Sequence, residues 1–449
     1  MKTRLHFMAF VFLAILPADG LSGEAPQQSF PDVLFSGNLR LRYEHKDNFN
    51  IKRYGIDSSD DFLLTRLRLN ADLLLREDFH AFAQLQDSRI FFGDLNRHDF
   101  DRKCPHENRI DLRQAYIEHK SLGGGPFGLK LGRQAISYGD NRIWGPGNWG
   151  NAGRYTWDAA KLYYYTDFVH LDAIAGEHIF YDATKFDGYH YDYQVYGLYA
   201  QLPRTKAANF DLFYVLKRDH HDHTAGESGI SDLKRHTVGT YVKGKFGETD
   251  AGTFDYNGTA AYQFGDHGKD TVKAYAAVGE MGYTFKRRFT PRLYAACSYA
   301  SGDSDPDDGD NGTFDGVNGA VDKLYGRINF FSFKNLIDYQ CGLSINPSKK
   351  SKLSVDYHLF QLARSKDAWY WSNCKNQLRD NTGASGRSLG QEVDFIAKWQ
   401  VPLSPSMKKT IKKLELLAGY SYFIPGRFVE NKGSGGDANW AFLQMALFF

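Results

Sequence analysis

Apolar and polar residues alternate with a period of two along much of the chain. In residues 35–43 the odd positions are apolar or glycine, whereas the intervening positions carry Ser, Asn, Arg and Arg, followed by Glu44. Residues 63–75 and 254–264 repeat the pattern. Such alternation predicts strands with one apolar and one polar face. A soluble β-sandwich rarely sets Arg, Arg and Glu opposite a long apolar face, whereas a transmembrane barrel meets lipid on one side and water on the other.

Eighteen runs of this kind are present, and weak alternation in runs such as 110–119 and 271–283 leaves sixteen as the alternative count. The runs cover residues 34–44, 62–75, 78–87, 110–119, 127–135, 157–165, 168–177, 192–201, 209–217, 235–244, 253–264, 271–283, 291–301, 335–346, 352–362, 389–400, 413–423 and 439–449.

The connections between the runs alternate in length, as they do in outer-membrane barrels, where periplasmic turns are short and outer loops are long. Long connections are predicted at 45–61, 88–109, 136–156, 178–191, 218–234, 302–334, 363–388 and 424–438. The intervening connections are mostly short, and the last run ends in an aromatic residue, Phe449. The pattern predicts an all-β, transmembrane, antiparallel up-and-down barrel in the outer membrane of a Gram-negative bacterium, with both ends on the periplasmic side.

The first residues have the features of a secretory signal. Lys2 and Arg4 precede an apolar stretch over residues 5–16, and the small or polar residues 17–20 supply a cleavage site. We therefore expect a signal peptide at 1–20, a polar lead-in at 21–32 and a barrel at 33–449, with no plug domain. A mean hydropathy of −0.50 and the absence of a later run of 18 apolar residues exclude a bundle of membrane helices.

Composition narrows the function classes further. Aromatic residues make up 15% of the chain, which suits the aromatic girdles of a membrane barrel, and the net charge of +2 gives no reason to expect nucleic-acid binding. No Gly-x-Ser-x-Gly motif or zinc-protease helix is present, so the chain is predicted not to be an enzyme. The alternatives are a barrel enzyme using His170 with Asp172 or His358 with Asp356, and a general diffusion porin for small anions or sugars.

The side chains predicted to point inward include many charges. By the parity of the runs they are Arg40, Arg42, Arg66, Arg68, His80, Gln84, Lys130, Asp255, Asn257, Asp356, Glu392, Asp394 and Lys398. A guanidinium group binds a carboxylate through two parallel hydrogen bonds, so the arginines of the first two runs favour acidic solutes. The alternative is that these charges only solvate the lumen and pair with inward acids.

The predicted periplasmic turns are basic. They carry Lys206, Lys286, Arg287, Arg288, Lys349, Lys350, Lys408, Lys409 and Lys412, with few acids beside them. A basic inner mouth would concentrate anionic solutes arriving from the periplasm. Ordinary solvated turns are the alternative.

The stretch 131–140, with the sequence LGRQAISYGD, is followed by Arg142, Gly145-Pro146, Trp149, Asn151, Gly153-Arg154 and Asp158. This block resembles the central motif of the alginate-export porin family, and weaker matching pieces lie at 39–44, 66–69, 112–116, 301–315 and 390–394. The resemblance implies an 18-stranded barrel whose arginine-lined constriction passes a polyuronate outward, without a required cofactor. Its implied partners are outer-membrane lipid, an anionic polysaccharide and periplasmic export or assembly proteins.

The same resemblance implies pore-lining roles for Arg133, Arg154 and Asp158 beside the early arginines. Simple parity places Arg133 on the face of Leu129 and Leu131. A bulge after residue 132 would resolve this conflict.

Two loops contain residues that could bind metals. Asp303, Asp305, Asp307, Asp308 and Asp310 lie in one predicted outer loop, where they resemble a calcium loop without EF-hand spacing. Residues 219–223, with the sequence DHHDH, offer side chains that bind transition metals. Solvated polar loops are the alternative in both places.

The four cysteines form two groups. Cys104 and Cys374 fall in predicted outer loops, where an oxidising compartment permits a disulfide between them. Cys297 and Cys341 lie on adjacent predicted strands among apolar neighbours, and they are expected to be free, buried thiols.

Overall fold

A computed structural model gives the arrangement of the chain. It describes residues 30–449 except 51–52, 101–103, 204, 206, 227–228, 306, 373–376 and 434–435. The predicted signal peptide and most of the lead-in therefore lie outside the described residues.

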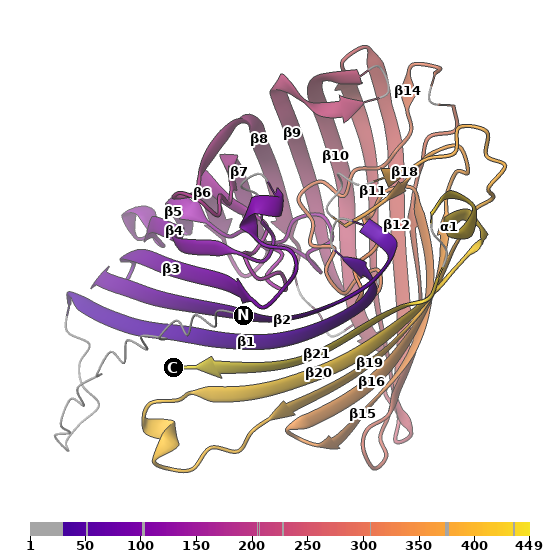
Figure 1. Ribbon diagram of the computed structural model, residues 1–449. Helices are drawn as coiled ribbons and strands as arrows, with labels where there is room; N and C mark the ends of the chain where they lie inside the picture. Colours follow the sequence, from indigo (N-terminus) through magenta and orange to yellow (C-terminus); the bar gives the residue numbers. More distant parts are fainter. Residues whose placement is uncertain are drawn as a thin grey trace, which may run out of the picture.

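Eighteen long antiparallel strands form a closed barrel, because the first strand pairs with the last (Figure 1). The predicted number of strands and the fold class are confirmed. The strands are β1 (Asp32–Asn50), β2 (Arg53–Arg76), β3 (Phe79–Phe91), β4 (Asn108–His119), β5 (Phe127–Gln134), β6 (Thr156–Tyr165), β7 (His170–Phe180), β8 (Gly188–Gln201), β9 (Asn209–Gly226), β10 (Gly229–Phe246), β11 (Gly252–His267), β12 (Asp270–Phe285), β13 (Arg292–Ala300), β15 (Leu336–Ser348), β16 (Ser351–Leu362), β19 (Ser388–Gln400), β20 (Lys413–Pro425) and β21 (Ala438–Phe448).

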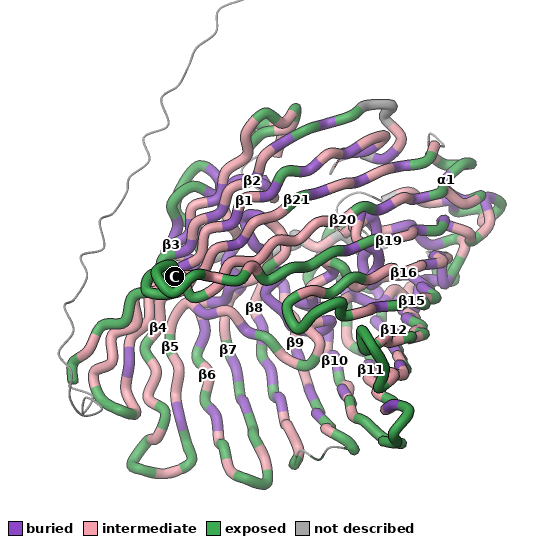
Figure 2. The backbone as a smooth tube through the Cα atoms, turned by 90° about the horizontal axis from the view of Figure 1, so that it is seen from below, coloured by how far each residue is buried: buried purple, intermediate pink, exposed green. Residues whose placement is uncertain are grey.

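The two faces of the wall follow the predicted parity. In β2 the even positions 62–68 are buried inside the barrel, and Leu69 on the other face is 44% exposed. Buried and exposed positions alternate along most strands in the same way (Figure 2). Because the outward positions carry large apolar side chains such as Phe35 and Leu198, this face suits the hydrocarbon of a membrane. Among the described residues, no helix is long and apolar enough to cross a membrane.

Three connections are much shorter than predicted. β1 and β2 stay paired up to Asn50 and Arg53, and β9 and β10 up to Gly226 and Gly229, so 45–61 and 218–234 are mainly extended hairpins. The connection predicted at 178–191 reduces to 181–187. Apolar alternation ends where a strand leaves the membrane, but backbone pairing continues into water, and this explains the error.

The long connections of the outer side fold into the barrel (Figure 1). They include residues 135–155 between β5 and β6, 301–335 between β13 and β15, and 363–387 between β16 and β19. Short elements lie in this layer or in the turns: β14 (Asp310–Asn311), β17 (Trp369–Tyr370), β18 (Gln377–Leu378), α1 (Arg427–Lys432), and the short 3-10 helices η1 (Arg97–Phe100), η2 (Leu122–Gly124) and η3 (Met407–Lys409).

Aromatic side chains pack the inward loops against the wall. Phe331 of the 301–335 loop stacks on Phe360 of β16 with ring centroids 3.9 Å apart, and Phe330 contacts Phe423 of β20 at 5.1 Å. Trp369 is buried in the same cluster. The outer part of the lumen is therefore packed with protein, and these loops narrow any path through it.

The cysteines differ in part from expectation. Cys297 and Cys341 are free, as predicted, but they are exposed on the outward face of the wall and not buried. Apolar neighbours indicated burial because lipid-facing and core-facing surfaces have the same composition. Cys104 is a free, buried thiol, and Cys374 lies outside the described residues.

Candidate functional site

Four arginines of the first hairpin form a cluster on the inner face of the barrel. Strand register places Arg40 of β1 opposite Arg66 of β2, and Arg68 opposite Asn38. Arg42 lies two residues further along β1. The exposed fraction of each of the four arginines is between 3% and 8%. Alternation thus directs all four side chains inward, where they lie beneath an inward loop.

The tip of the 135–155 loop binds this cluster through its backbone. Arg40 donates to the carbonyl oxygens of Trp149 at 2.9 Å and Gly150 at 3.1 Å. Arg42 donates to the same Trp149 carbonyl at 3.0 Å, and Arg66 donates to the Asn148 carbonyl at 2.9 Å. Backbone carbonyl oxygens thus accept hydrogen bonds from three of the four arginines, and Arg68 donates to the side-chain oxygens of Gln86 at 2.7 Å and Asn148 at 3.2 Å.

Negative charge is scarce around these four arginines. Glu44 is the one carboxylate in salt-bridge contact with them within the described part of the chain; it lies 2.7 Å from Arg42 and is also 3.6 Å from Lys46. The Nε atoms of Arg40 and Arg66 are buried and have no hydrogen-bond acceptor among the described residues. The cluster therefore keeps a positive charge. Its unused N–H groups could donate hydrogen bonds to a carboxylate.

The residue that follows the loop tip, Asn151, is anchored to the wall and to the neighbouring loop. The Asn151 amide nitrogen donates to the carbonyl oxygens of Thr65, Arg89 and His106 at 3.1, 3.2 and 2.7 Å. Ser88 donates to the Asn151 carbonyl at 2.9 Å. These bonds fix the position from which the loop tip reaches the arginines.

The loop also joins the neighbouring 301–335 loop. Gly145 donates to the Asn318 carbonyl at 3.0 Å, and Asn318 donates to the Ile143 carbonyl at 3.1 Å. At the tip, the Arg42 guanidinium lies 4.5 Å from the centre of the Trp149 ring, which also packs edge-on against Phe442 of β21. Sequence reasoning did not identify these roles of Asn151 and Trp149, although both belong to the motif over 131–158.

The positions of Arg133 and Asp158 do not support the pore-lining role expected for them. Arg133 forms a bidentate ion pair with Asp158 at 2.9 and 3.1 Å, and both residues share the outward parity of Leu131. Register is continuous through residue 132, so the expected bulge is absent there. The neighbouring wall has a bulge elsewhere, at Arg113 of β4, where the pairing with β3 shifts. Arg154 lies in the inward loop, half-buried, with its guanidinium over the Tyr155 ring.

The other predicted inward charges have partners away from the arginine cluster. Asp255 and Glu280 bind Arg292 at 2.5 and 2.7 Å. Glu392 accepts backbone hydrogen bonds from residues 327 and 328 of an inward loop. Other contacts involve Asp356 with Tyr294, Asp394 with Ser421, Lys398 with Glu415, His80 with Asp72 and Glu118, and Lys130 with the Tyr116 ring.

Comparison with known proteins identifies the kind of barrel. Residues 32–441 match the protein family described as Alginate export. The chain belongs to this family. A search of curated proteins finds no match.

Solved structures with a similar fold are outer-membrane porins of Pseudomonas aeruginosa. OpdQ aligns with a TM-score of 0.64 at 11% identity, over 93% of this chain and 99% of that chain. OccK3 (OpdO) aligns with a TM-score of 0.60 at 10% identity, over 93% and 96%. OpdK, solved with vanillate, aligns with a TM-score of 0.60 at 11% identity, over 92% and 98%.

At these identities the structural likeness shows the fold alone. Together with the family match, it makes this alginate-export family member an outer-membrane channel of a Gram-negative bacterium. The family and the similar structures are channels and not enzymes. In the two pairs considered for a barrel enzyme, tyrosines bind the acids: Tyr138 donates to Asp172, and Tyr294 donates to Asp356 at 2.7 Å.

The basic turns of this family member lie as predicted at the ends of strands opposite the inward loops. Lys349, Lys350, Lys408 and Lys409 are exposed, whereas Lys286 is 3.2 Å from Glu248. Lys206 lies outside the described residues.

Two carboxylates of the candidate calcium loop, those of Asp303 and Asp310, have protein partners. Asp303 accepts backbone hydrogen bonds from residues 305 and 312, and Asp310 pairs with Lys273 at 2.9 Å. No group of three or more potential metal ligands converges in the described part of the chain. In the second candidate, Asp219 binds Thr224, while the side chains of 221–223 lie outside the described residues.

Proposed function

We propose that this channel passes an anionic polysaccharide, an alginate-like polyuronate, from the periplasm to the exterior, and that the arginine cluster selects for its charge. The observation that carries the proposal is the set of Arg40, Arg42, Arg66 and Arg68 inside the barrel with Glu44 as their paired carboxylate. A polyuronate presents one carboxylate per sugar, each a stronger acceptor for guanidinium than a neutral carbonyl oxygen.

Release of the polymer requires that each contact be weak and repeated. The carbonyl oxygens of residues 148–150 provide competing acceptors for the same guanidinium groups. A carboxylate that leaves an arginine is thus replaced by the loop and does not leave a bare buried cation. This competition lowers the free-energy barrier for a carboxylate of the polymer to move from one arginine to the next.

The test for charge selection is the reversal potential in planar bilayers under a salt gradient. We expect the parent channel to prefer anions, and the double variant Arg66→Glu, Arg68→Glu to lose or invert that preference. The control is Arg89→Glu with Arg97→Glu, which makes the same change in net charge at two residues outside the cluster, in β3 and in η1. A parent channel without anion preference would overturn the proposal.

The test for the substrate uses a strain that lacks the channel. Acidic polysaccharide should accumulate in the periplasm and decrease outside, while uptake of small sugars stays normal. The dense packing of Phe330, Phe331 and Trp369 in the outer lumen favours a second candidate, a diffusion channel for small anions or sugars. Normal polymer secretion with reduced uptake of a small solute would replace the first proposal by this one.

A further inference from the structure

Three exposed arginines lie at the outer ends of three neighbouring strands, β16, β19 and β20. Arg364 follows β16, Arg387 precedes β19, and Arg427 begins α1 after β20. These three residues are called the rim arginines below. They belong to connections on the outer side of the barrel, opposite the basic turns.

Backbone contacts place Arg364 and Arg387 close together. Leu362 donates to the Arg387 carbonyl oxygen at 2.8 Å, and the Arg387 Nε atom donates to the Leu362 carbonyl oxygen at 2.7 Å. Arg364 follows two residues after Leu362. Its backbone is held by the Asn335 side chain, which accepts from the Arg364 nitrogen at 2.7 Å and donates to the Arg364 carbonyl oxygen at 3.1 Å.

Arg427 joins the other two rim arginines from the next strand. Gly426 donates to the Leu389 carbonyl oxygen at 2.9 Å, which fixes the start of α1 beside the start of β19. A Cβ at Gly386 would lie 3.9 Å from the Arg427 side chain, so Arg427 lies next to the residue that precedes Arg387. Three separate backbone segments thus bring three guanidinium groups to one part of the rim.

The acids of the 363–387 loop do not neutralise the rim arginines. Asp367 pairs with Arg379 at 3.0 Å, and Asp380 lies 3.5 Å from Lys432. Within the described part of the chain, none of the rim arginines forms a salt bridge.

The α1 connection contributes one exposed carboxylate. Glu430 follows Arg427 by three residues without forming a salt bridge to it in the described structure, and Asp437 accepts a hydrogen bond from a tyrosine of β20. Residues 373–376 and 434–435, which lie outside the described residues, include no Asp or Glu. The rim therefore keeps an excess of positive charge.

Strand register shows how far along the wall the rim arginines lie. Tyr299 of β13 pairs with Ile337, Ile337 pairs with Gln361, and Gln361 pairs with Ser388. Ser388 is the residue after Arg387. The rim arginines are therefore located just beyond the level of Tyr299, on its outer side.

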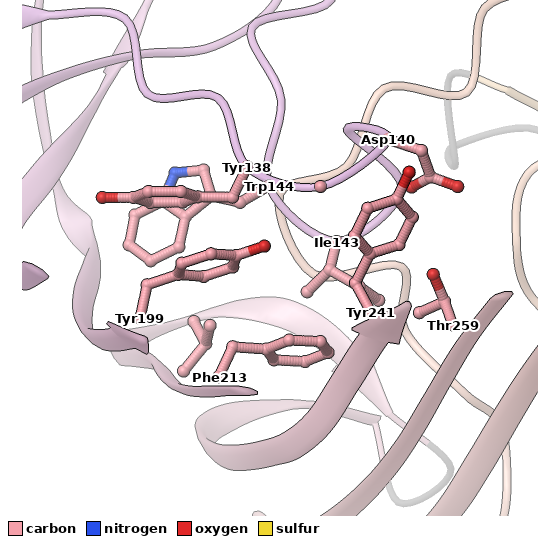
Figure 3. Close-up of a pocket in the computed structure, with 10 residues that line it drawn as sticks. Tyr138, Asp140, Ile143, Trp144, Tyr199, Phe213, Tyr241 and Thr259 are labelled. Atoms are coloured by element: carbon pink, nitrogen blue, oxygen red, sulfur yellow. The ribbon is translucent and has the colours of Figure 1, made fainter. Parts of the chain in front are cut away.

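Two tyrosines mark this level on the outward face of the wall. Tyr275 and Tyr299 stack with ring centroids 5.5 Å apart and planes 19° apart, and Tyr275 is 49% exposed. By contrast, Tyr138 and Tyr199 stack on each other inside the barrel (Figure 3). Outward aromatic rings of membrane barrels lie at the boundary between hydrocarbon and water. Residues just outside them are at the depth of the lipid headgroups.

We propose that the rim arginines bind the phosphate groups of a glycolipid in the outer leaflet of the outer membrane. Guanidinium binds phosphate oxygens through paired hydrogen bonds, and clusters of basic residues beside a membrane attract anionic headgroups. The acyl chains of the same lipid would lie on the outward face below, where Tyr339 and Leu343 are exposed. This lipid site does not depend on which solute the channel passes.

The test is binding of bis-phosphorylated lipid A to the folded barrel in neutral detergent, measured by native mass spectrometry. Dephosphorylated lipid A is the second probe. We expect the double variant Arg364→Gln, Arg427→Gln to bind the phosphorylated lipid roughly 25-fold more weakly, about fivefold for each cation near a membrane surface. Arg364→Lys with Arg427→Lys keeps both charges and should recover most of the affinity. Arg387 is left unchanged because its side chain bonds the Leu362 backbone.

The control is Lys349→Gln with Lys409→Gln, which removes the same charge from exposed short turns at the opposite end of the barrel. It should bind lipid A as the parent does. Heat-dependent mobility on gels checks that each variant is folded. Equal binding of dephosphorylated lipid A to the parent, or an equal loss of affinity in the control, would overturn the proposal.

A hexauronate tests the other anion that reaches this side of the membrane. If it binds the parent and not the Arg364→Gln, Arg427→Gln variant, while lipid A binds both equally, the rim arginines serve the emerging polymer and the lipid site is wrong. If lipid A alone depends on these arginines, the lipid site is supported.

Discussion

At the scale of single residues, the arginine cluster depends on groups that a sequence does not bring together. Arg40 of β1 lies directly opposite Arg66 of β2, and the two positive charges would repel each other without acceptors nearby. The carbonyl oxygens of residues 148–150, more than 80 positions away from Arg66 in the chain, supply those acceptors. Asn151 anchors this segment by bonding three backbone carbonyls and accepting a bond from Arg40.

Replacement of Asn151 by Ala should loosen the loop. It leaves buried carbonyl oxygens without a donor, and each such group costs about 1–3 kcal/mol. We expect a lower transition temperature in heat-modification gels and faster proteolysis of the 135–155 loop. Asn148→Ala, which removes a single bond from Arg68 at 3.2 Å, is the control and should change the transition less. Equal effects of the two variants would contradict this role of Asn151.

Asp187, in the outer connection between β7 and β8, gives a prediction for pH. Burial, followed by the hydrogen bond and charge of Asp111, raises the pKa of Asp187 from 3.8 to about 8. The folded protein therefore binds this proton more tightly than the unfolded chain. The resulting stabilisation is full below about pH 4 and is lost as pH rises to about 8.

The check compares thermal stability from pH 4 to pH 9 in the parent and in Asp187→Asn. The amide cannot ionise, so the parent should lose stability relative to the variant across this window. Asp94→Asn, at an exposed outer position, should follow the parent. Parallel curves for the parent and Asp187→Asn would show that Asp187 does not titrate in this range.

At the scale of elements, closure depends on the pairing of β1 with β21. Their register runs from Asn38 with Phe448 to Asp47 with Asn439. The terminal residue extends it, since Phe449 and Gly37 exchange backbone hydrogen bonds at 2.9 and 3.0 Å. The Phe449 ring occupies the space beside Gly37, where a Cβ would be 2.6 Å from it.

Gly37→Val should therefore impair closure. The added atoms collide with the Phe449 ring and with the Arg68 carbonyl oxygen, which cannot move freely. We expect a smaller folded fraction in membranes, measured by heat-dependent gel mobility. Gly279→Val is the control, because a Cβ at Gly279, on the outward face of β12, meets no atom within 4 Å. Normal assembly of Gly37→Val would mean that the ring can be displaced at little cost.

At the scale of the whole molecule, the outward face is an apolar belt that includes two free thiols. Cys341 of β15 pairs with Ala295, two residues from Cys297 on β13, so both thiols lie close together on this face. Lipid would cover them in the membrane. The sequence alone cannot distinguish a lipid-covered position from a position in a protein core, because apolar neighbours are typical of both.

Labelling can distinguish the two kinds of burial. In intact outer membranes, a charged maleimide should leave Cys297 and Cys341 unmodified, whereas a membrane-soluble maleimide should react with both. Mild detergent that keeps the barrel folded should allow the charged reagent to react. A chain with both residues changed to Ser is the control for labelling elsewhere. Thiols that stay unreactive to the membrane-soluble reagent would indicate a core position.

Period-two alternation was sufficient to predict the fold. In a barrel wall each residue faces lipid or lumen by its parity alone, so the inward direction of Arg40, Arg42, Arg66 and Arg68 follows from local sequence. The alternation of short and long connections predicted which end of the barrel faces the periplasm for the same reason, since it depends on neighbours in the chain. Parity was also correct for Arg133, whose pore-lining role came from resemblance instead.

The sequence by itself determined an all-β barrel of eighteen or sixteen strands, the two faces of each strand and the family. The tertiary structure alone decided that the 135–155 loop enters the lumen and binds the arginines, that strands extend into 45–61 and 218–234, and that Tyr138 stacks on Tyr199. The physical reason is that a strand's faces are set by the alternation of its own residues. A loop's path is set by contacts between segments far apart in the chain, for which no local pattern exists.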